Sequence, residues 1–362
     1  MTNPVTSIQR TVADYKTKDA KDKRRFWVDG LLNNALYILM AIFIIYTAIV
    51  NENFLKLGSI ANIISQVAAY LPLALGIGGC IVLTGTDLSA GRVVGLSAAV
   101  SAALLQNADS ARRLLSGFPA LPAWQGILLA IAAVILVGGI IGFVNGFFVA
   151  KFKLHPFIVT LATQLITYGL ILMFFTLNGN NGQPLSGLSS GYTNFVTGKM
   201  ISINKTTSLP WYVLYAVIFT VIMWFIWNKT TFGKNMFAVG SNAEAANVSG
   251  VNVFKTTVMV HTLAGIMYGL AGFLEGPRVG SVTQGTGLNY ECDAIAACVI
   301  GGVSFVGGTG KISGIVLGVF ILRIIFVALT MLGISPDLQY LIKGGIILVA
   351  CALDMRKYLV KK

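Results

Sequence analysis

Hydrophobic residues along this chain gather in long runs, and charged residues stand between the runs. Asp, Glu, Lys and Arg are missing from residues 57–86, 114–150, 154–198, 206–228, 256–274 and 294–310. A helix needs about 20 apolar residues to cross a bilayer, and most of these stretches are long enough. The pattern predicts about ten membrane-spanning helices, at residues 31–50, 62–84, 91–106, 124–150, 157–176, 209–228, 256–273, 293–308, 312–332 and 338–354. The predicted fold class is all-α, a polytopic membrane protein.

The composition agrees with the pattern. Of the 362 residues, 56% are hydrophobic and 11% charged, whereas a soluble domain carries about 25% charged residues. This composition excludes most soluble enzymes, and the spans leave no room for a large soluble domain. The four cysteines are scattered through apolar segments and the chain has two histidines, so we expect no metal site and no cofactor.

The net charge of +13 suggests nucleic acid at first sight, but the basic residues lie mainly between the apolar runs and at the chain ends. With the N-terminus inside, eighteen Lys and Arg, Arg92 among them, fall on the cytoplasmic side and six on the other. This bias fits the positive-inside rule. It predicts a cytoplasmic segment 1–30, a transmembrane domain 31–354 and a cytoplasmic tail 355–362, with no nucleic-acid partner.

Glycines predict that some spans are interrupted. They cluster at 76–79 and at 301–310, and glycine weakens a helix. Breaks at membrane depth accompany transport paths where protein or water covers the exposed backbone. Tight helix packing is the alternative reading, and the sequence leaves both open.

The polar stretch 229–255 separates two clear spans and predicts a short helix from 241 to 249. Ser241 and Glu244 have the spacing of a capping box, Ala245 and Ala246 favour helix, and Gly250 stands where a C-terminal cap is expected. A self-capped helix between spans indicates a docking site, with a plain connector as the alternative.

Charged residues at membrane depth are costly, about 2.5 to 3.5 kcal/mol each on insertion scales, so each needs a partner. Asp87 lies between two apolar runs, where it can cap the next helix near Ser89 or pair with Arg92. Glu291 and Asp293 stand two residues apart and cannot both face one side of a helix. For Arg323, within the span 312–332, Glu275 is one candidate partner.

Catalytic motifs are not evident. Gly310-Lys311 lacks the earlier glycine and the Ser or Thr of a phosphate-binding loop. Any ATP hydrolysis must therefore come from a partner, and we expect a transport subunit and not an enzyme.

Four motifs carry a family resemblance: GTDLSAG at 85–91, GFVNG at 142–146 with HPFIVTL at 155–161, EAA at 244–246 with SGVNV at 249–253, and YECDAIAA at 290–297 with GGVS at 301–304. In this order they resemble permeases of ABC sugar importers of the ribose/galactose class. GTDLSAGR and DAIAACVIGGVSF are more similar to the galactose/methyl galactoside type than to the ribose type, which points to galactose, methyl galactoside or glucose as cargo.

The resemblance implies a homodimer in the lipid of a bacterial inner membrane, with both termini cytoplasmic. It implies a periplasmic sugar-binding protein outside and a cytoplasmic ABC ATPase subunit inside, docked on Ser241, Asn242, Glu244, Ala245, Ala246 and Gly250. Candidates for the translocation path are Asp87, Ser89, Asn145, Glu291 and Asp293. The rival is a stand-alone, ion-coupled secondary sugar transporter with Asp87 or Glu291 as its proton or sodium site.

Overall fold

The structure is a computed structural model that describes residues 35–110, 112–119, 121–204 and 207–359. The predicted N-terminal segment 1–30 and the last residues of the predicted tail lie outside this part. The described elements are α3 (Ala35–Val50), α4 (Leu57–Val82), α5 (Ala90–Leu104), α6 (Ala123–Phe152), α7 (Pro156–Thr176), η1 (Leu177–Gly179), α8 (Ser190–Thr197), β1 (Lys199–Ser202), β2 (Ser208–Pro210), α9 (Trp211–Lys229), α10 (Thr231–Ser241), α11 (Ala243–Val248), α12 (Val253–Val279), α13 (Tyr290–Ile300), α14 (Ile312–Met331) and α15 (Pro336–Leu359).

The all-α fold class is confirmed, because the only strands in the described part form one small antiparallel hairpin, β1–β2. Six described helices, α4, α6, α7, α9, α12 and α14, are long and apolar enough to cross a membrane. The prediction of ten spans is not confirmed. The other four predicted segments contain α3, α5, α13 and α15, and α13 has only 11 residues, too few to cross a bilayer alone.

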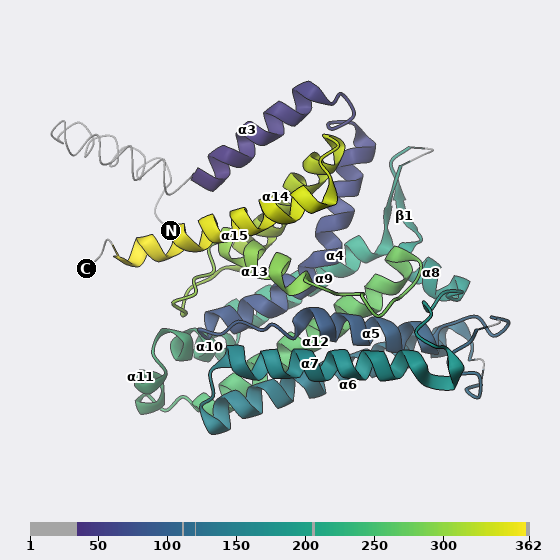
Figure 1. Cartoon of the computed structure of the whole chain (residues 1–362). Helices are drawn as coiled ribbons and strands as arrows, with labels where there is room; N and C mark the ends of the chain where they lie inside the picture. Colours follow the sequence, from purple (N-terminus) through teal and green to yellow (C-terminus); the bar gives the residue numbers. More distant parts are fainter. Residues whose placement is uncertain (1–34, 111, 120, 205–206, 360–362) are drawn as a thin grey trace.

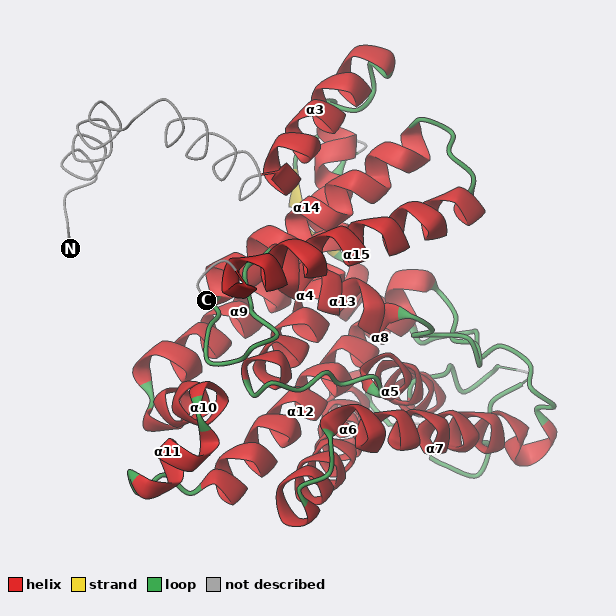
Figure 2. Ribbon diagram, turned by 60° about the vertical axis from the view of Figure 1, so that its left-hand side comes forward, coloured by secondary structure: helices red, strands yellow, loops and turns green. Residues whose placement is uncertain are grey.

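Helix α12 lies at the centre of the bundle and packs against α6, α5 and α4 (Figures 1 and 2). Its closest approach is to α6, along a row of glycines at every fourth position. A Cβ on Gly146 would lie 2.7 Å from the Cα of Val258, and Gly142 and Gly138 approach the backbone of α12 more closely still. Small residues at this spacing let two membrane helices touch along their backbones.

A second group of helices packs on the other side of α4. Helices α13 and α14 pack against each other and both pack against α4, α15 packs against α13, and α3 packs against α14 (Figure 2). Asn51, just after α3, donates from Nδ2 to the carbonyl of Met331 at the end of α14, 2.8 Å away. These contacts place the end of α3 beside the end of α14.

The contacts also define two ends of the bundle. Gly308, shortly before α14, donates its N–H to the carbonyl of Val82 at the end of α4, 2.9 Å away, beside the end of α10. The hairpin β1–β2 and helix α8 lie at the opposite end, next to the start of α9 (Figure 1). Because α4 ends and α14 begins near α10, Leu57 and Met331 lie toward the hairpin end.

Candidate functional site

The polar segment between α9 and α12 forms two short helices, α10 and α11, that project at one end of the bundle (Figure 1). The start of α11 is capped by Asn242, whose side-chain oxygen accepts from the N–H of Ala245 at 2.9 Å. Its end has the hydrogen bonds of a Schellman motif, from Gly250 to Asn247 and from Val251 to Ala246, both 3.0 Å. Gly250 has φ +84°, a left-handed conformation that suits glycine.

The predicted capping box at Ser241 is wrong. Ser241 is the last residue of α10, and the chain extends only at Asn242, with φ −162°. The N-cap therefore falls one residue later, and Glu244 lies in the first turn of α11, exposed to solvent. A carboxylate there is stabilised by the helix dipole. Ala246 is buried, Ala245 is exposed, and Val248 is 89% exposed.

Three glycines join this segment to the rest of the bundle. Gly240, near the end of α10, meets the carbonyl of Val82 and the N–H of Gly308 so closely that a Cβ could not fit between them. Gly307 and Gly308 have φ +87° and +65° and approach Gly240 and Ser241. We call Val82, Gly240, Gly307 and Gly308 the glycine joint. The backbones are in direct contact there. If α10 moves, the end of α4 and the segment before α14 must therefore move with it.

The path candidates fall into three places, of which the first is a fully buried cluster between α5 and α6. Asp87 accepts at Oδ1 from the N–H of Ser89 at 3.0 Å and from its hydroxyl at 2.6 Å. Asn145 on α6 donates to the same hydroxyl from Nδ2 at 3.0 Å. Asp87 thus orders the turn before α5 through Ser89, and no side chain at the N-cap accepts from the first N–H groups of α5.

The second place lies at the start of α13. Glu291 is buried, with its carboxylate against Gly91 of α5.

The alternative pairing of Asp87 with Arg92 is not observed. Arg92 donates to the carbonyl of Gln284 at 3.3 Å, and its guanidinium lies 4.2 Å from the ring centroid of Tyr168. Arg92 is only 9% exposed, so its side chain lies within the bundle and not in an open loop.

The third place surrounds Asp293, on the face of α13 turned away from Glu291. Arg323 of α14 donates from Nη2 to Oδ2 of Asp293 at 2.7 Å, and Nζ of Lys343 lies 2.6 Å from Oδ1. The candidate pairing of Arg323 with Glu275 is wrong, because the guanidinium of Arg323 forms its ion pair with Asp293. The expectation that Glu291 and Asp293 face different ways is confirmed.

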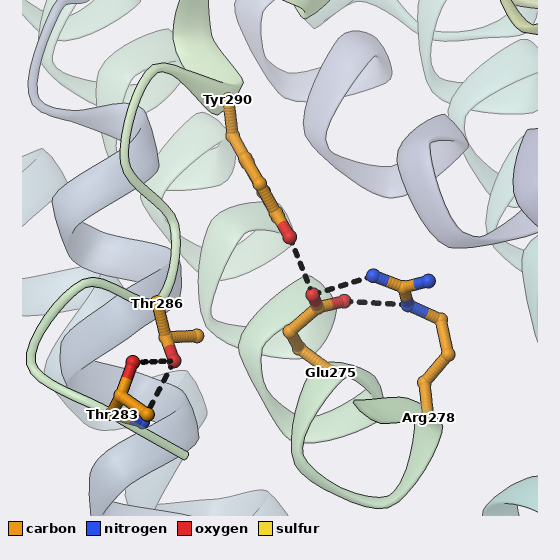
Figure 3. Close-up of polar contacts among 5 residues, drawn as sticks. All are labelled: Glu275, Arg278, Thr283, Thr286 and Tyr290. Carbon is orange, nitrogen blue, oxygen red and sulfur yellow. Dashed lines mark hydrogen bonds and ion pairs between the residues drawn. The ribbon is translucent and has the colours of Figure 1, made fainter. Parts of the chain in front are cut away.

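Glu275 has partners of its own (Figure 3). Arg278, one turn later on α12, donates to both oxygens at 2.6 and 2.8 Å, and the hydroxyl of Tyr290 donates to Oε1 at 2.6 Å. The ring of Tyr290 packs against Tyr70 at 5.0 Å, and the guanidinium of Arg323 lies 3.8 Å from the Tyr70 centroid. Polar and aromatic contacts thus run without a break from α12 through α4 to α14.

Sequence reasoning missed Lys343 and Tyr70 as members of this network. A lysine within the predicted span 338–354 was an available signal, since a membrane-depth cation needs an anion. Nothing in the sequence gave the distance to Asp293. Among the described residues, no cluster of three or more His, Cys, Asp and Glu side chains could hold a metal ion.

Comparison with known proteins agrees with a transport role. A family model described as a branched-chain amino acid transport system / permease component matches residues 59–351. The galactose/methyl galactoside import permease proteins MglC of Salmonella typhimurium and Escherichia coli are each 42% identical over 95% of this chain and 99% of their own. The ribose import permease protein RbsC of Bacillus subtilis is 34% identical over 93% of this chain and 97% of its own.

No solved structure matches the chain significantly. The family model covers far more than half of the chain, and the relatives align with it along nearly their whole length. The six apolar helices agree with a membrane-spanning transport subunit. The chain therefore belongs to the family of permease components described for the branched-chain amino acid transport system.

Proposed function

We propose that the chain is the permease subunit of an ATP-driven importer that carries galactose and methyl galactoside into the cytoplasm. The observation that carries this proposal is the 42% identity over 95% of the chain to permeases of that name, against 34% for the ribose permease of Bacillus subtilis. Both kinds of relative are import permeases, which speaks against a stand-alone ion-coupled transporter.

The proposed docking site for the cytoplasmic ATPase subunit is the exposed segment α10–α11. Asn242 and Gly250 fix the two ends of α11, and Glu244 and Ala245 remain free to contact a partner. Ser241 lies against Gly308 of the glycine joint, and Ala246 is buried and anchors α11. The joint supports a role for this segment in passing movement to α4 and α14.

With this segment in the cytoplasm, the bundle has a defined orientation in the bacterial inner membrane. The loops around α8 and the β1–β2 hairpin then face the periplasm, where a sugar-binding protein would dock. Helix α15 runs back toward the end where α10 and α11 lie (Figure 1), which supports a cytoplasmic C-terminus. The proposed assembly has two copies of this chain in lipid, and partner binding shifts it between inward-open and outward-open states.

For the path, the structure supports two kinds of candidate. Asp87, Ser89 and Asn145 form a buried cluster joined by hydrogen bonds through Ser89, so their proposed role is to shape the break before α5. Glu291 and Asp293 lie on opposite faces of α13 beside buried arginines, where a change in helix packing would expose them.

The experiment is uptake of labelled sugar at micromolar concentration by cells that lack this chain and by the same cells complemented with it. We expect the deletion to lose uptake of galactose and methyl galactoside while ribose uptake stays unchanged. A selective loss of ribose uptake would contradict the cargo assignment and leave the permease class standing.

A further inference from the structure

A polar hollow of about 290 Å³ lies where α4, α13, α14 and α15 meet. We call it the α15 hollow, and it is lined by Gln66, Tyr70, Asp293, Arg323, Phe326, Thr330, Pro336, Gln339, Tyr340 and Lys343. Its volume is at the lower limit of small-molecule pockets, which start near 300 Å³. An apolar bundle has no packing reason to place five acid, base and amide side chains around one space.

The floor of the hollow is charged and buried. Asp293 and Arg323 are 4% and 5% exposed and form the ion pair described above. The Nε–H of Arg323 is buried and finds no acceptor in the described part of the chain. A buried donor without an acceptor is unfavourable, so a small movement that brings this N–H to the hollow lets the floor gain from a ligand that accepts a hydrogen bond.

The mouth of the hollow is exposed and lies at the hairpin end of the bundle. Thr330 and Pro336 are exposed, and Tyr340 is 58% exposed. Thr330 follows Arg323 by two turns of α14, or about 10 Å along the helix. The hollow thus leads from the end away from α10 and α11 to buried charges within the bundle.

The wall offers further free polar groups. Gln66, on α4, is half-buried in the lining and makes no hydrogen bond with the described residues. Gln339, on α15, donates to the carbonyl of Ile334 at 2.9 Å and keeps its side-chain carbonyl free. Amides supply both donors and acceptors, as hydroxyl groups require.

The charges decide between two ligand classes. Arg323 and Lys343 together would attract an anion, but the carboxylate of Asp293 lies between them within 2.7 Å of each nitrogen. An anion at the floor would have to compete with this carboxylate for Arg323 and Lys343, with which Asp293 is already paired. A neutral polyhydroxyl ligand has no such penalty, and its hydroxyls can donate to Asp293 and accept from Arg323.

We propose that the α15 hollow is a weak binding site for the sugar cargo, entered from the periplasmic side and floored by Asp293 and Arg323. This inference rests on the proposed function, since it assigns the imported hexose a place on the permease itself. The site lies outside the Asp87 cluster and apart from the coupling segment.

The test is a titration of the permease–ATPase complex in lipid nanodiscs with methyl galactoside, followed by saturation-transfer NMR, which detects weak binding. Gln66→Leu keeps the volume of the side chain and removes its polar groups. We expect the half-saturating concentration to rise about threefold to tenfold, the value of one lost hydrogen bond. Gln125→Leu, the same change on an exposed turn of α6, is the matched control and should leave it unchanged.

A second variant, Asp293→Asn, keeps the shape of the floor and removes its charge, and gel filtration reports on its folding. We expect it to weaken binding more than Gln66→Leu does. Equal binding by the Gln66→Leu variant and the unaltered protein overturns the inference, as does a site that takes sulfate in preference to methyl galactoside. In both of these outcomes, transport of methyl galactoside by the unaltered complex in vesicles would still support the proposed function, and only the binding site in the α15 hollow would be withdrawn.

Discussion

Replacing Gly240 by alanine tests the glycine joint. The added Cβ would lie 2.9 Å from the N of Gly308 and closer still to the carbonyl oxygen of Val82, whereas atoms in contact settle near 3.5 Å. The Val82 carbonyl must therefore move by roughly 1.5 Å, which displaces the hydrogen bond that it accepts from Gly308. Overpacking costs about 1–3 kcal/mol and the displaced bond about as much again.

Helix propensity alone would make the Gly240→Ala variant more stable, because alanine is about 1 kcal/mol more favourable than glycine within a helix such as α10. Any loss must come from the crowded joint. The net cost of about 1–5 kcal/mol does not exceed the 5–15 kcal/mol that holds a domain folded, so we expect the joint to open and the bundle to remain.

The assay compares ATP hydrolysis and sugar uptake by the reconstituted complex. We expect Gly240→Ala to keep the ATPase subunit bound and hydrolysing while uptake falls at least tenfold, since α11 is untouched and only the connection to α4 is lost. Gly169→Ala on α7, where a Cβ meets nothing within 4 Å, is the control. Normal uptake by the Gly240→Ala variant would show that the glycine joint does not connect α10 to transport.

Three further variants probe other parts of the account. Glu244→Lys reverses an exposed first-turn charge at a helix cost of about 1 kcal/mol, so we expect normal membrane insertion on immunoblots but no uptake, and unchanged uptake would remove Glu244 from the docking surface. Asp87→Asn keeps the shape and some hydrogen bonding, so uptake should persist in part and stay dependent on ATP. Gly138→Ala, which drives a Cβ into the α12 backbone, should destabilise the purified protein by about 1–3 kcal/mol, whereas Gly139→Ala, with its nearest neighbour 3.5 Å away, should not, as thermal unfolding in detergent will measure.

The long spans could be predicted from the sequence because hydropathy acts locally. The predicted ranges 124–150 and 157–176 differ by at most two residues from α6 and α7. The predicted span 293–308 fails because α13 ends at Ile300 and Gly302 adopts φ +82°. A glycine's conformation depends on what packs beside it, and hydropathy cannot report that.

The candidate site was predictable only in its local parts. Ser89 and Asp87 interact across two residues, so spacing was enough to suggest a cap. The sequence alone could not choose between Ser241 and Asn242 as the N-cap, because both residue types cap helices well. In the structure Ser241 is still part of α10, so Asn242 takes the N-cap position. The pairing of Arg323 with Asp293 spans 30 residues, and only the packing of α13 on α14 selects it over Glu275.

The most direct test of the central claim uses proteoliposomes that contain this chain with its ATPase subunit, supplied outside with the sugar-binding protein and labelled methyl galactoside. We expect label to accumulate inside against its gradient only when ATP is present at the ATPase subunit and the binding protein is added. Accumulation driven by a proton or sodium gradient without ATP would contradict it and establish the chain as a secondary transporter.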